Sequence, residues 1–127
     1  SLWFQREFSL GSKKRGCHKV TDEIVSNLPE IQQYKMGLLN IHIKHTSASI
    51  VLNECWDSDV RVDMEMMLNK LVPQGLPYKH SCEGPDDMPA HVKAALLGSS
   101  VTIPISDGQL NMGTWQGIWL CEHRDRA

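Results

Sequence analysis

The segment from residue 101 to residue 112 constrains the fold of this chain more than any other. Apolar residues alternate on both sides of an Asp107-Gly108 pair, at Val101, Ile103, Ile105, Leu110 and Met112. An Asp-Gly pair favours a two-residue type I′ turn, because both central residues of that turn need a positive φ. This turn pairs Ile105 with Leu110, and it pairs Ile103 with Met112 on the same face. The pattern therefore predicts an antiparallel β-hairpin.

Periodic patterns elsewhere predict further strands and a few helices. Alternating apolar residues indicate strands at residues 2–10 and 39–45. Apolar residues on both faces indicate a strand covered on both sides at residues 114–123. Helical spacing indicates two helices, at residues 20–28 and 60–71. A third short helix is expected from about Pro89 to Leu97, because Asp86-Asp87 precede it and Gly98 follows it. Strands outnumber helices and do not alternate with them, so we expect an α+β fold, mainly an antiparallel β-sandwich with two or three short helices.

Composition and charge narrow the class of protein. The 127 residues contain no repeat and no linker, so we expect a single domain spanning residues 1–127. The formal net charge of −2 and the lack of a long basic run argue against nucleic-acid binding. No apolar stretch approaches the roughly 18 residues of a membrane span, so no membrane partner is expected. The four cysteines lack the spacing of a disulfide framework or a zinc ribbon, which predicts reduced thiols in a cytoplasmic protein.

The loop between residues 80 and 91 is the densest group of residues capable of chemistry. It contains two histidines and three carboxylates, namely His80, Glu83, Asp86, Asp87 and His91. Imidazole and carboxylate groups together suit zinc, manganese or magnesium. The alternative interpretation is structural, with Asp86 and Asp87 capping the following helix and both histidines exposed to solvent. The spacing leaves both interpretations open.

A second polar group follows the strand at residues 39–45. His45 shares the apolar parity of that strand, and small hydroxyl residues follow it directly. Such residues leave room and hydrogen-bond donors for an anion. The alternative is a core histidine whose ring bonds to a backbone carbonyl. Further along the chain, Asp57, Asp59 and Asp63 are equally explained as helix-start charges and a solvated helix face.

Four segments together resemble one known family. They are His45-Thr46-Ser47-Ala48-Ser49, Asn53-Glu54 with Asp57-Ser58-Asp59-Val60-Arg61, the loop from Glu83 to His91, and Gly113-Thr114-Trp115-Gln116-Gly117-Ile118. In this order they resemble the YjbQ family, whose members are described as secondary thiamine-phosphate synthases. The resemblance implies a compact, jelly-roll-like β-sandwich that assembles as a homotrimer, with a polar site near a subunit boundary. It also implies that this site uses the residues matching His45, His80, Asp87, His91 and Glu122.

The function that the resemblance implies is a transfer reaction on phosphorylated small molecules. A pyrimidine pyrophosphate is joined to a thiazole phosphate, and pyrophosphate leaves. The charge of that leaving group requires a divalent metal or basic side chains. We therefore expect a divalent metal, Mg²⁺ or Zn²⁺, and no organic cofactor. Carboxylates available for the metal are Asp59, Asp63, Asp86, Asp87 and Glu122, and the nearby basic residues are Lys79, Lys93 and Arg124.

The expected site divides into three sets of residues. The catalytic set is His45, Asp87, His91 and Glu122. Of these, His45 or His91 is expected to move protons, because imidazole titrates near neutral pH. The set expected to bind the phosphorylated substrate is Thr46, Ser47, Lys79, Gln116 and Arg124. The expected metal ligands are the three imidazoles of His45, His80 and His91.

Two other functions remain open from the residues alone. One is a metal- or anion-binding module without turnover, which the absence of any standard phosphate loop favours. The other is a metal-dependent hydrolase, in which zinc activates water and Glu83 or Glu122 acts as the base. Four tryptophans are also more than one small core hides easily, and aromatic residues are enriched at interfaces. This excess agrees with the homotrimer that the resemblance implies.

Overall fold

The structure is a computed structural model that describes residues 3–126 of the chain. Within this range there are six strands: β1 (Gly16–Lys19), β2 (Met36–His42), β3 (Ala48–Glu54), β4 (Ser100–Ser106), β5 (Gln109–Leu110) and β6 (Gln116–Glu122). The same residues form the helices α1 (Thr21–Ser26), α2 (Ser58–Leu71) and α3 (Asp87–Leu97) and the 3₁₀ helix η1 (Pro29–Gln33). None of the helices in residues 3–126 combines the length and apolarity needed to cross a membrane.

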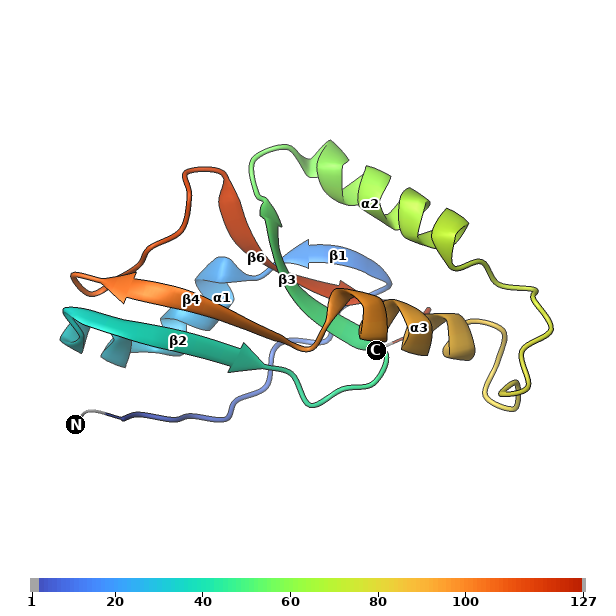
Figure 1. The fold of residues 1–127 in the computed structure, drawn as a ribbon, viewed down its shortest axis with the longest axis horizontal. Helices are drawn as coiled ribbons and strands as arrows, with labels where there is room; N and C mark the ends of the chain where they lie inside the picture. The colour runs from blue at the N-terminus through green and yellow to red at the C-terminus, as the bar shows by residue number, and fades with distance from the viewer. Residues whose placement is uncertain (1–2, 127) are drawn as a thin grey trace.

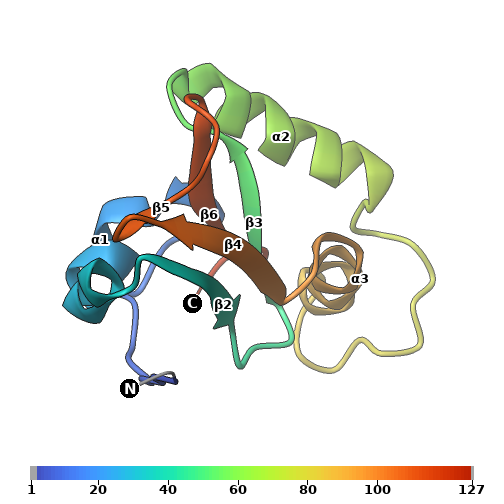
Figure 2. The same ribbon diagram turned by 60° about the vertical axis from the view of Figure 1, so that its left-hand side comes forward.

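The strands form two antiparallel sheets, and this confirms the expected α+β sandwich. One sheet has the order β1-β6-β3, and the other has the order β2-β4-β5. Figure 2 shows the strands of the two sheets crossing one another. In the central strand β6, Ile118 and Trp119 are both completely buried although they point to opposite faces. The strand is therefore covered on both sides, as the sequence predicts.

The hairpin at residues 101–112 forms with the expected turn. Asp107 and Gly108 both have positive φ, and Ile105 is paired with Leu110. The backbone of Gln32 lies 3.0 Å from the position that a Cβ at residue 108 would take, so glycine is required there for space as well. The second expected pair does not form, because β5 ends at Leu110 and Met112 lies beyond it.

The main core lies between the two sheets and under α1 and η1. Eight buried side chains meet there: Val20, Ile24, Leu28, Ile31, Ile50, Ile103, Ile105 and Ile118. They come from α1, η1 and both sheets, so the core joins segments from the first and last quarters of the chain. The helix α1 ends at Ser26, and Pro29 begins η1 three residues further on, because proline cannot continue the hydrogen bonding of the first helix.

The other two helices pack on the outer side of the sheet β1-β6-β3 (Figure 1). The helix α2 contacts β1, and Asp57 is its N-cap, because the Asp57 side chain accepts a hydrogen bond from the Asp59 N–H. The helix α3 contacts β3 and ends at Gly98, as predicted. The apolar stripe of α2 is less buried than its spacing indicates. Leu68 is buried, whereas Leu71 at the end of the helix is 69% exposed.

Three local predictions are wrong. The strand predicted at residues 2–10 does not form, because residues 3–14 join neither sheet. Phe8 and Leu10 from this segment pack against the core. Leu2 lies outside the described residues. The strand β2 ends at His42, so His45 lies in the following loop and is exposed rather than on an apolar strand face. The final strand begins at Gln116, which leaves Trp115 outside it, exposed and in edge-to-face contact with Trp56.

Candidate metal centre

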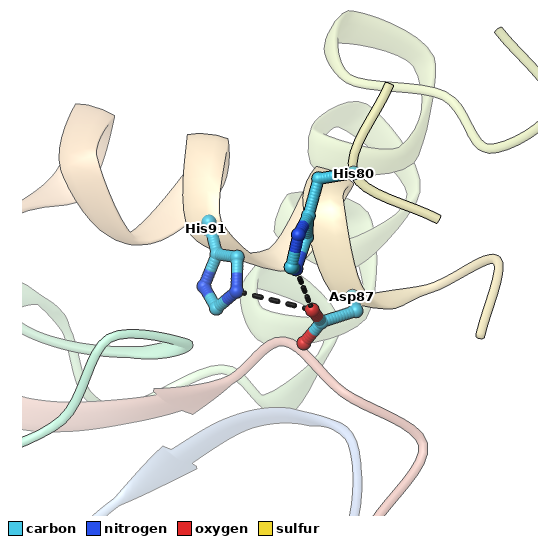
Figure 3. A group of neighbouring side chains, drawn as sticks. All are labelled: His80, Asp87 and His91. Carbon is cyan, nitrogen blue, oxygen red and sulfur yellow. Dashed lines mark hydrogen bonds and ion pairs between the residues drawn. The ribbon is translucent and has the colours of Figure 1, made fainter. Parts of the chain in front are cut away.

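Two histidines and one aspartate meet at the start of α3 (Figure 3). Asp87 is the first residue of α3, and His91 follows one turn later on the same helix face. His80 comes from the long loop that joins α2 to α3. The predicted cluster at residues 80–91 therefore does converge in space. One ligand atom from each residue lies within 4.8 Å of the other two, and no other such group occurs among residues 3–126.

Both imidazole rings direct a nitrogen at the same carboxylate oxygen. The Nε2 atom of His80 lies 2.6 Å from Asp87 Oδ2, and the Nε2 atom of His91 lies 3.2 Å from it. The two ring centres are 5.5 Å apart. Two nitrogens and one oxygen therefore converge on one point. The group is open to solvent on the side of His80, because the His80 side chain is 43% exposed.

The backbone fixes which nitrogen of a neutral His91 ring carries the proton. Its Nδ1 atom lies 2.9 Å from the Thr46 carbonyl oxygen, which only accepts hydrogen bonds. Nδ1 must therefore carry the proton, and in the neutral ring Nε2 presents its lone pair to Asp87 Oδ2. Two lone pairs facing each other require a cation between them, either a proton or a metal ion. A metal-ligating histidine is held by the same type of contact to a carbonyl.

Asp87 is held ionised in a buried position. Only 3% of its side chain is exposed, and its second oxygen, Oδ1, lies 3.2 Å from Arg124 Nη1. Burial by itself raises the pKa of this carboxyl group. The hydrogen bond to His80, the charge of His91 when its Nε2 also carries a proton, and the charge of Arg124 outweigh burial and hold the pKa of Asp87 below its usual value. The carboxylate is thus available as an anionic ligand.

Asp86 connects this group to the end of the chain. Asp86 is the N-cap residue of α3, as in the structural alternative, but its side chain makes no capping hydrogen bond. It instead accepts hydrogen bonds from the Asp125 N–H at 2.9 Å and from the Arg124 guanidinium at 3.3 and 3.4 Å. These bonds lower the pKa of Asp86. Arg124 also donates to the Glu83 carbonyl, so one guanidinium ties the loop, the helix start and the segment after β6 together.

A hollow of about 300 Å³ adjoins His80 on the side of the α2–α3 loop. Its lining is mostly apolar or backbone: Gly75, Leu76, Tyr78, His80, Ser81, Gly84, Pro85, Met88 and Pro89. This volume is in the range of small-molecule sites. Another hollow of similar size lies under α1 and β5 and contains none of the three converging residues.

The structure separates several expected site residues from this group. His45 is not among the converging ligands, and its Nδ1 accepts a hydrogen bond from the Ser47 N–H at 3.0 Å. Of the three histidines predicted as ligands, His80 and His91 therefore converge, together with Asp87, whereas His45 does not. Ser47 itself is buried, and Thr46 contributes its carbonyl rather than its side chain.

The remaining predicted site residues, the substrate contacts and the catalytic Glu122, are dispersed. Gln116 begins β6 and bonds to the Gly113 N–H at 2.8 Å, whereas Glu122 ends the strand. Six residues of strand place these two roughly 20 Å apart. Glu122 is buried and accepts a hydrogen bond from the Arg124 N–H. Lys79 is exposed in the loop before His80, and Arg124 is engaged by Asp86 and Asp87 rather than free for a phosphate.

Other predicted groups take structural positions. The carboxylates of Asp59 and Asp63 lie on α2, where both residues are exposed, and they do not join the converging ligands. Lys93 is 1% exposed and donates to Asn69 Oδ1 at 2.7 Å. Burial, together with the nearby charge of Arg15, lowers the pKa of Lys93. Sequence reasoning missed the Thr46 carbonyl and the positioning role of Arg124, because both depend on which strand ends meet α3.

The fold and the cluster define a two-sheet α+β domain with a His-Asp-His group at one helix start. Residues 6–127 match the family described as UPF0047 protein YjbQ-like, and the chain belongs to this family. It is 47% identical over 123 residues to the UPF0047 protein YjbQ of Escherichia coli O157:H7, covering 97% of this chain and 89% of that protein. A UPF0047 protein of Methanocaldococcus jannaschii is 38% identical over 111 residues, covering 87% of this chain and 78% of the other.

Solved structures agree with this assignment. An uncharacterized conserved protein of the YjbQ/UPF0047 family from Clostridium acetobutylicum superposes with a TM-score of 0.76 at 37% identity, covering 91% of this chain and 92% of the other. A hypothetical protein from Aeropyrum pernix K1 superposes with a TM-score of 0.79 at 28% identity, covering 91% and 89%. The family and fold expected from the sequence motifs are confirmed.

Proposed function

We propose that this chain is a metal-dependent enzyme that acts on a phosphorylated small molecule. In this proposal His80, Asp87 and His91 hold a divalent metal at the start of α3. The observation that carries it is the pair of Nε2 atoms directed at Asp87 Oδ2, one of which has its lone pair fixed by the Thr46 carbonyl. A site of three protein ligands with an open side is typical of catalytic rather than structural metals.

The donor atoms favour zinc over magnesium. Two imidazole nitrogens and one carboxylate oxygen suit zinc or another transition metal. Magnesium prefers an octahedral shell of oxygens, and the carboxylates expected to supply it are not gathered here. Zn²⁺ is therefore the metal that we propose, in place of the open choice between Mg²⁺ and Zn²⁺.

The proposed reaction is the one that the YjbQ resemblance implies. The pyrimidine methylene carbon forms a bond to the thiazole nitrogen as its bond to the pyrophosphate oxygen breaks, and pyrophosphate leaves. When bound, a divalent metal neutralises charge on such a leaving group. Asp87 would keep the site anionic, and Arg124 would position Asp87. The hollow beside His80 supports a substrate of small-molecule size.

A metal-content experiment tests the site. Purified protein is stripped with a chelator and titrated with Zn²⁺ by calorimetry, and we expect about one tightly bound ion per chain. The variant His42→Ala is the matched control, because His42 is an exposed histidine at the end of β2. A chain that binds no more zinc than its His80→Ala and His91→Ala variants does not contain the proposed centre.

A product assay tests the reaction separately. The metal-loaded protein is incubated with a pyrimidine pyrophosphate and a thiazole phosphate, and thiamine phosphate is quantified. The proposal expects product that depends on metal and on His91. Absence of product above blank at high enzyme concentration contradicts the transferase assignment even if zinc binds. The zinc-type ligand set also favours metal-assisted hydrolysis, so the same preparation is assayed against a panel of phosphoesters.

We also propose that the chain assembles as a homotrimer. β2 is an edge strand of its sheet, yet Met36 and Leu38 on it are 87% and 73% exposed. An exposed apolar edge strand is an aggregation risk unless a partner covers it. A second copy of the chain is the partner that the family resemblance implies.

The free cysteines agree with our proposal of a cytoplasmic location.

A further inference from the structure

Two cysteines face each other across neighbouring strands, away from the metal-centre residues. Cys17 on the edge strand β1 is the direct register partner of Cys121 on the central strand β6. Their Sγ atoms lie 3.2 Å apart, and the Cys121 thiol donates a hydrogen bond to Cys17. Both are free thiols, as are Cys55 and Cys82.

The strand geometry suits a disulfide without movement of the backbone. Directly opposed residues of an antiparallel pair have Cα atoms roughly 4.5–5.5 Å apart. A disulfide accepts Cα separations of about 4.4–6.8 Å and needs its sulfurs about 2.05 Å apart. The two sulfurs must therefore approach by about 1.2 Å, which small changes of the side-chain torsion angles supply. The bond would connect segments 104 residues apart in the sequence.

The surroundings of the two sulfurs give them different roles. The hydrogen bond from Cys121 lowers the pKa of Cys17, and the positive charges of Arg61 and Lys93 act in the same direction against burial and the charge of Glu65. The same hydrogen bond and burial raise the pKa of Cys121. Cys17 is half-buried, whereas Cys121 is 1% exposed. An oxidant from solvent therefore meets the more acidic thiol first, and the thiolate is the reactive form.

We propose that Cys17 and Cys121 form a redox-active dithiol that a peroxide converts to a cross-strand disulfide. The Cys17 thiolate attacks one peroxide oxygen and breaks the O–O bond, which leaves a Cys17 sulfenic acid while the departing hydroxide takes a proton to become water. The Cys121 sulfur then attacks the Cys17 sulfur and forms the S–S bond. The sulfenic oxygen leaves with the Cys121 proton as a second water. In total, two thiols and one hydrogen peroxide give one disulfide and two waters.

The product joins the edge strand of a sheet to its centre. The next register pair along the two strands is Gly16 with Glu122, and Arg124 follows two residues later. The disulfide closes a loop of about 100 residues, which removes much of the conformational freedom of the unfolded chain. We therefore expect the oxidised protein to melt roughly 5–15 °C above the reduced protein, and a thiol reductant to reverse the shift.

Peptide mapping of the folded protein decides the proposal. The experiment uses the full chain and its Cys82→Ser variant, which lacks the exposed thiol. Both proteins are treated with hydrogen peroxide and then alkylated, first under native and then under denaturing conditions. They are digested, and the peptides are analysed by mass spectrometry. We expect a linked peptide pair that contains Cys17 and Cys121, two hydrogen masses lighter than the reduced pair. Cys55 should remain alkylated. Two intact thiols at Cys17 and Cys121 after excess peroxide, or a link formed only after denaturation, would overturn the proposal.

Single variants separate the two roles. In Cys121→Ala the sulfenic acid on Cys17 has no partner, so a dimedone probe should label residue 17. In Cys17→Ser, Cys121 should stay reduced under the same treatment, because it is buried and lacks its partner. Dimedone labelling at Cys121 in Cys17→Ser, without labelling at Cys17 in Cys121→Ala, would contradict the assigned order of attack. The mapping of the unsubstituted chain stands even if either variant fails to fold.

Discussion

The Nδ1 atom of His91 donates a hydrogen bond to the Thr46 carbonyl oxygen 2.9 Å away. This one bond sets the tautomer of His91 and turns its Nε2 lone pair toward Asp87. It also ties α3 to the loop that precedes β3. A backbone acceptor cannot be lost by substitution at Thr46, so the orientation of the ring is a property of the fold rather than of one side chain.

Removal of any one of the three converging side chains should weaken zinc binding by at least about 100-fold. The variants His80→Ala, Asp87→Asn and His91→Ala each leave two ligands in place of three. Calorimetric titration measures the loss, and His42→Ala should bind zinc as the unsubstituted chain does. Equal affinities for all of these variants would show that zinc binds elsewhere on the surface.

Substitution of Arg124 should weaken zinc binding without removing a ligand. Its guanidinium lies 3.2 Å from Asp87 Oδ1 and also binds Asp86, so Arg124→Gln loosens the carboxylate that would hold the metal. Partners of metal ligands typically contribute about 10- to 100-fold to affinity. Arg126→Gln, at an exposed position two residues later, is the control. An effect on substrate affinity alone, with zinc affinity unchanged, would instead support the direct phosphate contact predicted from the sequence.

Local sequence signals predicted the elements that depend on local chemistry. The Asp107-Gly108 turn forms because the φ preferences of two adjacent residues decide it. The group of His80, Asp87 and His91 was predicted in part for the same reason, since the residues lie within twelve positions and two of them share a helix face. Asp86 occupies the N-cap position of the helix, but its carboxylate binds Arg124 and the Asp125 N–H instead of capping the helix backbone.

Long-range relationships could not be predicted from local patterns. Arg124 reaches Asp87 only because β6 ends beside the start of α3, and the Cys17–Cys121 contact depends on the register of β1 against β6. His45 was placed on an apolar face by extending the two-residue period past His42, where the strand ends. Periodicity gives the face of a residue but not the point at which a strand stops.

Gly117→Ala should destabilise the fold by about 2 kcal/mol. A Cβ at this buried position in β6 would lie 2.6 Å from Cys55 Cβ and 3.3 Å from Thr21 Oγ1, so the strand or its neighbours must shift. Gly113→Ala is the matched control, because its new Cβ would meet only the Gln116 side chain, at 3.4 Å or more. Urea denaturation of both variants measures the difference. Equal midpoints would mean that the neighbours of Gly117 relax without cost.

The assembled protein should have a mass in solution near three times 14.4 kDa. Light scattering after size exclusion measures it. If neighbouring copies cover the apolar residues of β2, Leu38→Glu should lower the mass toward that of the monomer. Leu96→Glu changes a similarly exposed leucine on α3 and should not lower it. A stable monomer of the unsubstituted chain that binds zinc with full affinity would contradict the trimer while leaving the metal centre intact.

Stability should fall between pH 6.5 and pH 4 because of His123. This side chain is 1% exposed, its Nε2 bonds to Ser49 Oγ at 2.8 Å, and its Nδ1 has no partner within the described residues. Burial and the charge of Lys93 lower the pKa of His123 to about 4. The unfolded chain therefore binds a proton between pH 6.5 and pH 4 that the folded chain does not, and this contribution to stability is complete only above pH 6.5.

The expected loss is up to about 3 kcal/mol over this pH range. Urea denaturation at several pH values, with a chelator present to exclude metal binding, measures it. His123→Gln keeps an amide that can bond to Ser49 but does not titrate, so it should flatten the pH dependence even if it lowers stability at pH 7. His42→Gln changes an exposed histidine and should keep the original slope. If His123→Gln and the unsubstituted chain lose stability in parallel, protonation of another group dominates the acid sensitivity of the fold.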